Sequence, residues 1–514
     1  MKKRKIVIAV LLCLVFITPL FGSCKTGGNN SQQETAAPAT NADGSPATTI
    51  PAETKDPAAP ELPKADMGGK TFNFLTCGWG DSNDKSLDIG GEEQTGDPID
   101  DAAYNRRIKI EQEYNVKIKN IFAGSNDALI TKYQTSILAA DKAYDAAVIT
   151  CVNFTSMLTG NFLTDFSQLT YVDMNKPYWD KNFYDSMSVL GKHFAADGDI
   201  SKRRLECVWI MAFNKDLIQS NGMDSPYDLV KTGQWTYGKM QEMAKAVAKD
   251  LNGDGKMTLQ DDLWGLNYTG DTMMGIINSS GVKIAEVNKD GVPELTLGTE
   301  VNLNKLMQMF TDMRNQSYSI DTLFKVGGGL TGLGDVDIFA DNRCLFLACA
   351  THNVNPAPEE GANNTQGLRS LNVNLGIIPY PKWDASQAEY TPYTAGNYHP
   401  ALTVPQTNDD LDNTGILLEA MSYEGMKNIT PAFYENLLKT KTARDDESAD
   451  MLDFIFGNLQ YDIGNMYNLA GITGEFGYNM STNLRANIVS TIDKNINKWQ
   501  STIDKLMEQI RQYN

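Results

Sequence analysis

A short acidic segment in the middle of the chain has the spacing of a calcium-binding loop. Acidic and amide side chains alternate from residue 250, Gly255 permits a sharp turn, and another acid stands at the twelfth position. In the EF-hand pattern, such alternating oxygens and one backbone carbonyl surround a hard cation. Thr258 or Asp262 would help to complete the shell, because the twelfth residue is shorter than the usual Glu. The predicted ligands are the side chains of Asp250, Asn252, Asp254 and Asp261 and the carbonyl oxygen of Lys256.

The alternative for this segment is an Asx-rich turn at the end of a helix, with its acids solvated. The loop occurs once, and no pair of EF-hand helices flanks it. The sequence therefore favours a calcium ion with a structural role over a calcium sensor.

The first residues of the chain predict where the protein works. Four basic residues at positions 2–5 precede an apolar run that ends at Gly22-Ser23-Cys24. This is the pattern of a secretory signal, and Cys24 resembles the lipidated cysteine of a bacterial lipobox. Residues 25–66 are rich in Ala, Thr, Pro, Ser, Asn and Gly, which predicts a disordered tether. We expect a lipoprotein on the extracytoplasmic face of the cell membrane; an ordinary cleaved signal or an uncleaved anchor are the alternatives.

The charge and cysteine content exclude several classes of function. The formal net charge is −19, and it falls to −23 when the four basic residues of the signal are removed. This balance disfavours nucleic acid, whose binding depends on neutralising phosphates. Cys77, Cys151, Cys207, Cys344 and Cys349 remain in the body, an odd number at irregular spacing, so at most one disulfide is expected. The three histidines form no zinc pattern.

The body that follows the tether has the pattern of an α/β protein. Strands are predicted at 70–76, 116–121 and 144–149, with helices at 102–114 and 128–139 between them. Such βαβαβ units form parallel sheets that bind ligands at the carboxyl ends of the strands. Further strands are predicted within 206–218, 339–350 and 374–379, and further helices at 237–249, 414–423, 432–438, 448–456 and 483–511. About 450 residues are too many for one ordinary core and suit two lobes.

These features resemble the solute-binding lipoproteins of ABC importers, family 1, the carbohydrate type related to maltose-binding protein. The resemblance covers nearly all of 68–514, and none of its motifs is catalytic, so we expect a monomeric binding protein and no enzyme. It implies a two-lobed α/β fold of the type II periplasmic-binding-protein class, with a multi-crossing hinge. Its most specific motifs are Gly233-Gln-Trp235-Thr236, Asp262-Leu-Trp264-Gly265, Phe339-Ala-Asp-Asn-Arg-Cys344 and Ile378-Pro-Tyr-Pro-Lys382. The expected divisions are the signal at 1–23, the tether at 24–66, lobe I at 68–205 plus 381–430, and lobe II at 206–380 plus 431–514.

By this resemblance, the ligand is a sugar or oligosaccharide that is passed to permease subunits. Sugars need flat aromatic rings and planar polar groups. Such residues stand where predicted strands end and where the chain is expected to pass between lobes; each has a packing or ion-pair role as its alternative. The candidates are Trp79, Asp81, Asn153, Phe154, Arg204, Glu206, His352, Asn353, Tyr398 and His399.

Two other functions remain open from the sequence. An extracellular glycan hydrolase needs two carboxylates across a cleft, and nothing selects such a pair among 64 acidic residues. A calcium-stabilised surface adhesin would normally contain repeats, and the chain has none. The identity of the ligand does not follow from the sequence.

Overall fold

The computed structural model describes residues 56–78, 87–313, 317–321, 336–354, 367–396, 398–440, 442–476 and 487–513. The chain divides into a unit at 1–56 and a body at 57–514, and the body is described here. Cys24, Trp79 and Asp81 lie outside the described residues. None of the described helices is long and apolar enough to span a membrane.

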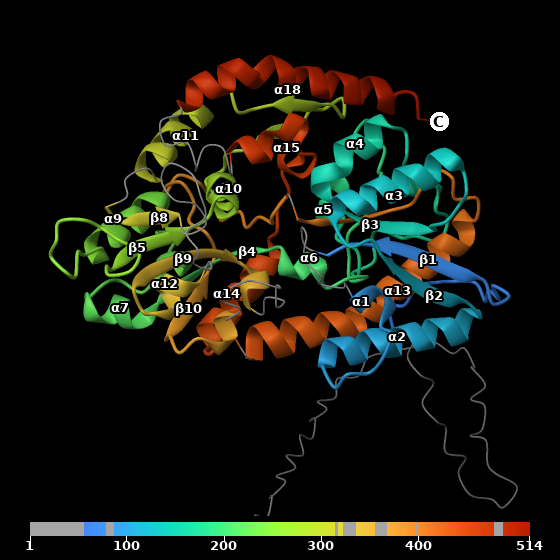
Figure 1. The fold of residues 1–514 in the computed structure, drawn as a ribbon, viewed down its shortest axis with the longest axis horizontal. Helices are drawn as coiled ribbons and strands as arrows, with labels where there is room; N and C mark the ends of the chain where they lie inside the picture. Colours follow the sequence, from blue (N-terminus) through green and yellow to red (C-terminus); the bar gives the residue numbers. More distant parts are fainter. Residues whose placement is uncertain are drawn as a thin grey trace, which may run out of the picture. The chain divides into compact units, whose positions relative to one another are not determined.

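Lobe I contains a four-stranded sheet of order β11-β3-β1-β2, which confirms the predicted βαβαβ start (Figure 1). β1 is parallel to β2 and β3, and Thr71 lies opposite Lys117. β11 adds an antiparallel edge, with Pro400 opposite Thr150. The strands are β1 (Thr71–Thr76), β2 (Lys117–Phe122), β3 (Ala146–Thr150) and β11 (Pro400–Thr403).

The alternation of side chains along β1 explains the three layers of this lobe. Phe72 and Phe74 pack in one apolar cluster with residues of α2 and α13, whereas Leu75 packs in another with residues of α3. Successive strand residues face opposite sides, so α3 covers one face and α2 and α13 cover the other. The helices of this lobe are α1 (Leu87–Gly90), α2 (Pro98–Tyr114), α3 (Asn126–Ala139), α4 (Phe154–Thr159), α5 (Lys181–Ser186) and α13 (Leu411–Pro431).

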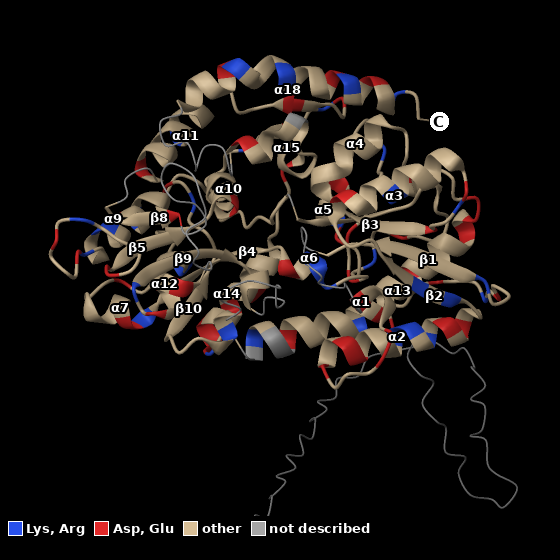
Figure 2. Cartoon of the chain, viewed as in Figure 1, with Lys and Arg blue, Asp and Glu red and all other residues tan. Residues whose placement is uncertain are grey.

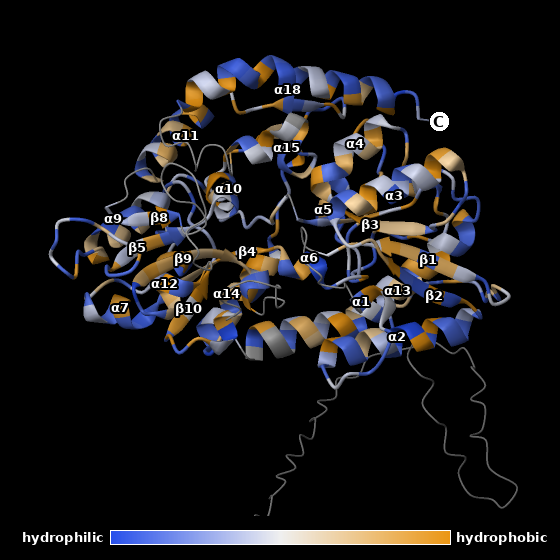
Figure 3. Ribbon diagram, viewed as in Figure 1, coloured by the Kyte–Doolittle hydropathy of each residue, from blue (hydrophilic) through white to orange (hydrophobic). Residues whose placement is uncertain are grey.

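Lobe II contains a mixed five-stranded sheet of order β10-β4-β9-β5-β8. β4 is antiparallel to β9 and β10, and β5 is parallel to β9 and β8. β4 and β9 are buried along their whole length and are mostly hydrophobic (Figure 3). The strands are β4 (Trp209–Asn214), β5 (Trp264–Tyr268), β8 (Ser319–Asp321), β9 (Cys344–Ala350) and β10 (Leu375–Ile378), with a separate hairpin of β6 (Ala285–Val287) and β7 (Pro293–Leu295).

Helices surround this second sheet. The apolar stripe at Leu306, Met309, Phe310 and Met313 is buried, as predicted for one face of a core helix. The helices are α7 (Lys215–Ser220), α8 (Pro226–Lys231), α9 (Tyr237–Val247), α10 (Gly270–Ser279), α11 (Glu300–Met313), α12 (Asp337–Ala340), α14 (Asp446–Gly457), α15 (Ile463–Met466) and α16 (Ile472–Gly474).

The chain passes between the lobes three times. α6 (Arg203–Glu206) leads from lobe I into β4, and a π-helix at Ala432–Thr440 continues α13 toward α14. Between these, residues 381–395 still bond to lobe II: Tyr237 N donates to the carbonyl of Lys382 at 2.7 Å, and Ala395 N to that of Cys207 at 2.8 Å. The structure therefore places this crossing after residue 395, later in the chain than the predicted boundary at 380/381.

The C-terminal helix α18 (Ile488–Ile510) contacts both lobes, through α11 of lobe II and α4 of lobe I. Trp499 belongs to the apolar cluster that contains α11, and Tyr513 Oη donates to the carbonyl of Leu158 at 2.9 Å. Acidic and basic side chains are interspersed along α18 and α2, and neither helix has a basic stripe (Figure 2). The predicted division, which gives all of 431–514 to lobe II, therefore does not include the contacts that this helix makes with lobe I.

Candidate ligand-binding site

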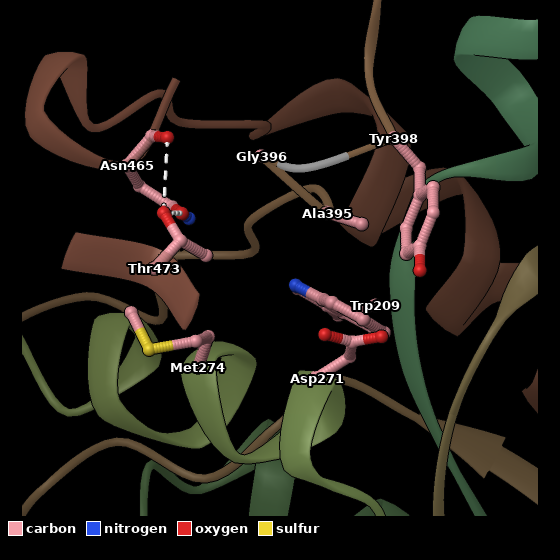
Figure 4. Close-up of a pocket in the computed structure, with 8 residues that line it drawn as sticks. All are labelled: Trp209, Asp271, Met274, Ala395, Gly396, Tyr398, Asn465 and Thr473. Atoms are coloured by element: carbon pink, nitrogen blue, oxygen red, sulfur yellow. Dashed lines mark hydrogen bonds between the residues drawn. The ribbon is translucent and has the colours of Figure 1, made fainter. Parts of the chain in front are cut away.

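A small pocket lies where β4, α10, the second crossing and the segment around α15 and α16 come together (Figure 4). It contains about 190 Å³ of space, part of which is open to solvent. This is less than the roughly 300–1,000 Å³ of common ligand pockets, so in this arrangement the pocket is too small for a whole oligosaccharide. The lining residues are Trp209, Asp271, Met274, Ala395, Gly396, Tyr398, Asn465 and Thr473.

Trp209, the first residue of β4, forms one wall of this pocket. Its side chain is 4% exposed, and its Nε1 has no hydrogen-bond partner among the described residues. The indole lies close against α10, where a Cβ added at Gly275 would come within 2.8 Å of the ring. Tyr380 stacks near it, with ring centroids 6.4 Å apart. The ring is therefore held rigidly, and Nε1 points into the pocket (Figure 4).

Asp271 supplies the carboxylate of the pocket from the first turn of α10. Thr269 caps this helix through a capping box with Thr272, which fixes the helix start beside Trp209. A carboxylate in the first turn is favoured by the helix dipole. Asp271 and Tyr398 lie on the same side of the pocket as the indole of Trp209 (Figure 4).

The opposite wall is held by a buried chain of amides. Thr473 Oγ1 donates to Asn465 Oδ1 at 3.0 Å, and Asn278 Nδ2 donates to Asp462 Oδ2 at 3.0 Å. Asn465 Nδ2 in turn donates to Asn278 Oδ1 at 3.4 Å. Burial raises the pKa of Asp462, although four N–H groups donate to its carboxylate. Gly396 completes this wall, because a Cβ there would come within 2.6 Å of the Asn465 side chain.

The pocket thus presents one indole donor, one carboxylate, a tyrosine ring and an amide–hydroxyl pair, a set that suits a small polar solute. Within the described residues, no group of three or more His, Cys, Asp or Glu side chains is arranged to hold a metal ion. The five cysteines of the body are buried thiols, and none of them forms a disulfide.

Of the predicted ligand-binding residues, Tyr398 lines the pocket. Phe154 is fully buried and packs edge-on against Tyr467, with ring centroids 4.9 Å apart. The neighbouring Asn153 is half-buried, and its Nδ2 has no partner. Neither lines the pocket of Trp209 in this structure.

Arg204 and Glu206, on α6, make ion pairs with different partners. Arg204 contacts Asp199 at 2.5 Å, and Thr430 of α13 donates to the same carboxylate at 2.6 Å. Glu206 pairs with Lys202 through one oxygen, whereas its other oxygen is buried without a partner. The structure therefore gives Arg204 the hinge ion pair that was the alternative to a ligand contact.

The remaining candidates lie elsewhere. His352 is exposed, and Asn353 Oδ1 accepts from Ala350 N at 3.0 Å, a turn-stabilising contact. His399 is 1% exposed and bonds to Asp197 and Thr394, both at 2.9 Å, so both of its ring nitrogens are engaged inside the protein. Seven lining residues were missed from the sequence: Trp209, Asp271, Met274, Ala395, Gly396, Asn465 and Thr473. The helix-start pattern at 269–272 is the one sequence signal that could have indicated Asp271.

The predicted calcium loop has a defined conformation. Asp250 accepts from Gly253 N at 2.6 Å and from Gly255 N at 2.7 Å. Asp262 is buried and accepts from the backbone N–H groups of Leu251 and Thr258, and these bonds, led by that of Thr258, lower its pKa. Asp262 thus stabilises the loop by hydrogen bonds to its backbone, and it is not placed to replace Asp261 as a calcium ligand. The other acids remain at the surface. Their oxygens are of the kind that calcium prefers, but in this structure they do not form a grouped metal site.

Comparison with known proteins is informative at the level of structure. No protein-family model and no curated protein sequence matches the chain. Among solved structures, it is similar to the cyclic alpha-maltosyl-1,6-maltose binding protein of Arthrobacter globiformis, with 12% identity and a TM-score of 0.56 over 86% of this chain and 99% of that one.

Two further solved structures have the same fold. One is UgpB of Mycobacterium tuberculosis in complex with glycerophosphocholine, at 13% identity and a TM-score of 0.53 over 85% of this chain and 99% of that one. The other is an ABC transporter solute-binding protein of Thermotoga lettingae bound with alpha-D-tagatose, at 12% identity and a TM-score of 0.51 over 85% and 100%. The chain therefore has the two-lobed, type II fold of ABC-transporter solute-binding proteins.

Proposed function

We propose that the protein is the solute-binding component of an ABC importer and that it captures a sugar or oligosaccharide. The observation that carries the proposal is the pocket beside the lobe crossings, where Trp209, Asp271 and Tyr398 face one small space. The fold supports it, because proteins of this fold include one named for a cyclic maltosyl-maltose and one bound to tagatose.

The two lobes supply the mechanism. Contacts made by the ligand to both lobes stabilise the arrangement in which they are closed, and the membrane permease then binds that arrangement. Tyr398 lies two residues before β11 of lobe I, whereas Trp209 and Asp271 belong to lobe II. A solute that touches Tyr398 and Trp209 thus connects the two sides of the second crossing.

Calorimetry with purified protein and a panel of neutral mono- and oligosaccharides tests this function. We expect one class of sugar to bind, and Tyr398→Ala to weaken binding about tenfold, because an aromatic contact is lost. Tyr104→Ala, which removes a half-buried tyrosine of α2, is the matched control and leaves the affinity unchanged. Turnover of any glycan by the purified protein would contradict a purely binding function and favour the hydrolase.

We also propose that lipidation of Cys24 anchors the protein on the extracytoplasmic face of the membrane. The tether would keep a monomeric binding protein close to its permease and so raise the effective concentration of captured solute. Labelling of cells with an alkyne fatty acid tests the anchor. Label incorporated by the natural chain and absent from Cys24→Ser is the expected result, and equal labelling of both would refute it.

A third proposal is a structural calcium ion at 250–261, with Asp250, Asn252, Asp254 and Asp261 as side-chain ligands. Trp264 gives a direct assay, because its Nε1 donates to the carbonyl of Thr258, inside the loop, at 3.1 Å. Terbium bound in the loop should therefore emit when tryptophan is excited, and calcium should quench this emission. Asp254→Asn should lose the signal; a signal equal to that of the natural chain would contradict the site.

A further inference from the structure

Trp209 differs from the other buried tryptophans whose hydrogen bonds are known. Trp179, Trp235 and Trp264 are at most 5% exposed, and each donates its Nε1 hydrogen to an acceptor in the protein. Trp209 is equally buried, yet its Nε1 has no partner in the part of the chain that the structure describes. Buried donors are almost always paired, and an indole N–H usually finds an acceptor. Nε1 is directed into the pocket, and none of the described residues supplies its acceptor (Figure 4).

The surroundings of Trp209 determine how it can act on a ligand. α10 lies so close to the indole that a Cβ at Gly275 would clash with it, and Tyr380 stacks beside it at an interplanar angle of 17°. With 4% of the side chain exposed, the face of the ring is not available for stacking on a sugar. Trp209 therefore contributes its edge, a single donor, and the half-buried Tyr398 is the ring that a sugar face could contact.

Asp271 contributes the complementary group in the same pocket. A carboxylate only accepts hydrogen bonds and has lone pairs for several donors, whereas an indole N–H only donates. A hydroxyl group satisfies both, because its oxygen accepts and its hydrogen is donated. An ammonium group offers no acceptor to Trp209, and a carboxylate or phosphate offers no hydrogen to Asp271 and carries a like charge.

We infer that Trp209 and Asp271 together bind one hydroxyl group of the solute and thereby select neutral, hydroxyl-rich ligands over their charged analogues. This inference rests on the proposed function and adds the two residues that determine its specificity. Trp209 Nε1 donates to the hydroxyl oxygen, and the hydroxyl donates to the carboxylate of Asp271. Charge-assisted hydrogen bonds are the stronger ones, so Asp271 contributes more to affinity and Trp209 fixes the position of the oxygen.

Calorimetry with matched sugars tests the inference. The probes are D-glucose, D-glucosamine and D-glucuronate, the corresponding galactose series, D-tagatose and maltotriose. The neutral member of a series should bind best. Trp209→Phe should weaken binding of the neutral sugar about fivefold, which corresponds to one neutral hydrogen bond. Asp271→Asn should weaken it tenfold or more and reduce the discrimination against the uronate.

Trp235→Phe is the matched control, because it also removes an indole but breaks an internal bond, to the carbonyl of Pro379 at 2.9 Å. It should lower the melting temperature and leave the affinity unchanged. The Trp209 Nε1–H resonance, identified by its absence in Trp209→Phe, should shift when the neutral sugar is added.

The results distinguish failure of the inference about Trp209 and Asp271 from failure of the proposed sugar-binding function. If a sugar binds and Trp209→Phe binds it as tightly as the natural chain, with no shift of the indole resonance, the inference is refuted and the proposed function stands. If the charged members of a series bind best, the inference is refuted as well. If no sugar binds under any condition, both fall.

Discussion

Asp462→Asn is the most informative single substitution in the wall of the pocket. The carboxylate of Asp462 is 1% exposed and accepts only from N–H groups. Ile284 N and Asn278 Nδ2 donate to one oxygen at 2.7 and 3.0 Å, and Gly464 N and Ala285 N donate to the other at 2.9 and 3.3 Å. Through Asn278, the same carboxylate orients Asn465, which lines the pocket. The substitution keeps the size of the side chain and replaces one acceptor oxygen with an NH₂ group.

The magnitude follows from the number of donors that lose an acceptor. The amide of Asn278 can rotate, but the backbone N–H groups of Ile284, Gly464 and Ala285 cannot, so at least one of them faces the new NH₂ group. An unpaired buried N–H costs about 1–3 kcal/mol, and the remaining bonds lose their charge assistance, about 1 kcal/mol more. Relief from burying the charge offsets part of this loss. We expect a net destabilisation of about 2–3 kcal/mol, a fall of roughly 5 °C in the melting temperature of a lobe this large.

The pH dependence gives this prediction a second readout. Burial raises the pKa of Asp462 above its ordinary value of 3.8, so the folded state holds the proton more tightly than the unfolded state. This stabilisation is complete below pH 3.8 and is lost as the pH rises through the folded-state pKa. The variant does not titrate at this position. The natural protein should therefore exceed the variant in stability most near pH 3.8. This difference should fall as the pH approaches the folded-state pKa of Asp462 and become constant at higher pH.

Differential scanning calorimetry between pH 4 and pH 8 measures both effects, and sugar binding measures the consequence for the pocket. Asp409→Asn, at an exposed carboxylate that pairs with Lys142, is the matched control and should leave both quantities unchanged. A melting temperature of Asp462→Asn equal to or above that of the natural chain would refute the reasoning, since the buried charge would then cost more than its four bonds contribute.

Three further predictions concern the crossings, the interior and the C-terminal helix. Gly425→Ala should destabilise the protein by about 2 kcal/mol or more, the cost of overpacking, because the new Cβ would lie 1.8 Å from the carbonyl oxygen of Asp199. Gly474→Ala is the control in the same thermal melt and should be tolerated, because its Cβ would have nothing within 4 Å. The thiols of Cys77, Cys151, Cys207 and Cys344 are buried and their pKa values are raised by burial, so Ellman's reagent should label them only after unfolding, and rapid labelling of the native protein would contradict this. Tyr513→Phe removes the bond to the Leu158 carbonyl and should cost about 1 kcal/mol in chemical denaturation; no change would mean that this contact of α18 is not formed in solution.

The fold was predictable where the signal is local. The predicted strand at 144–149 and helix at 128–139 match β3 and α3 within two residues, because their apolar spacing directly reports a buried face. β11 has no such signal. Its four residues become a strand only by pairing with β3, some 250 positions earlier in the chain, and a proline stands at its start. The second crossing was placed too early for a related reason, since residues 381–395 stay with lobe II through backbone bonds that the sequence does not encode locally.

The sequence predicted the region of the candidate site better than it predicted the residues that line it. His399 does lie at the carboxyl end of β3, where the carbonyl of His399 accepts from Cys151 N at 3.0 Å, but its ring turns inward to Asp197. Trp209 stands in an apolar run whose strand was predicted correctly. All six residues of β4 are buried, so no alternation of polar and apolar residues distinguishes the one that borders a pocket. Its role follows from an unpaired atom, which only the three-dimensional contacts reveal.

The position of α18 places a condition on lobe closure. In a hinge with three crossings, the lobes rotate about the crossing segments, and contacts away from them change most. α18 packs on lobe II through Trp499 and on lobe I through its last turn, where Ile510 is buried and Tyr513 packs against Phe194 with ring centroids 4.5 Å apart. Any change in the angle between the lobes must repack one of these two contacts. Under the proposed function, the affinity for solute includes the free energy of this fourth connection, and substitutions at its lobe I end should alter ligand affinity without touching the pocket.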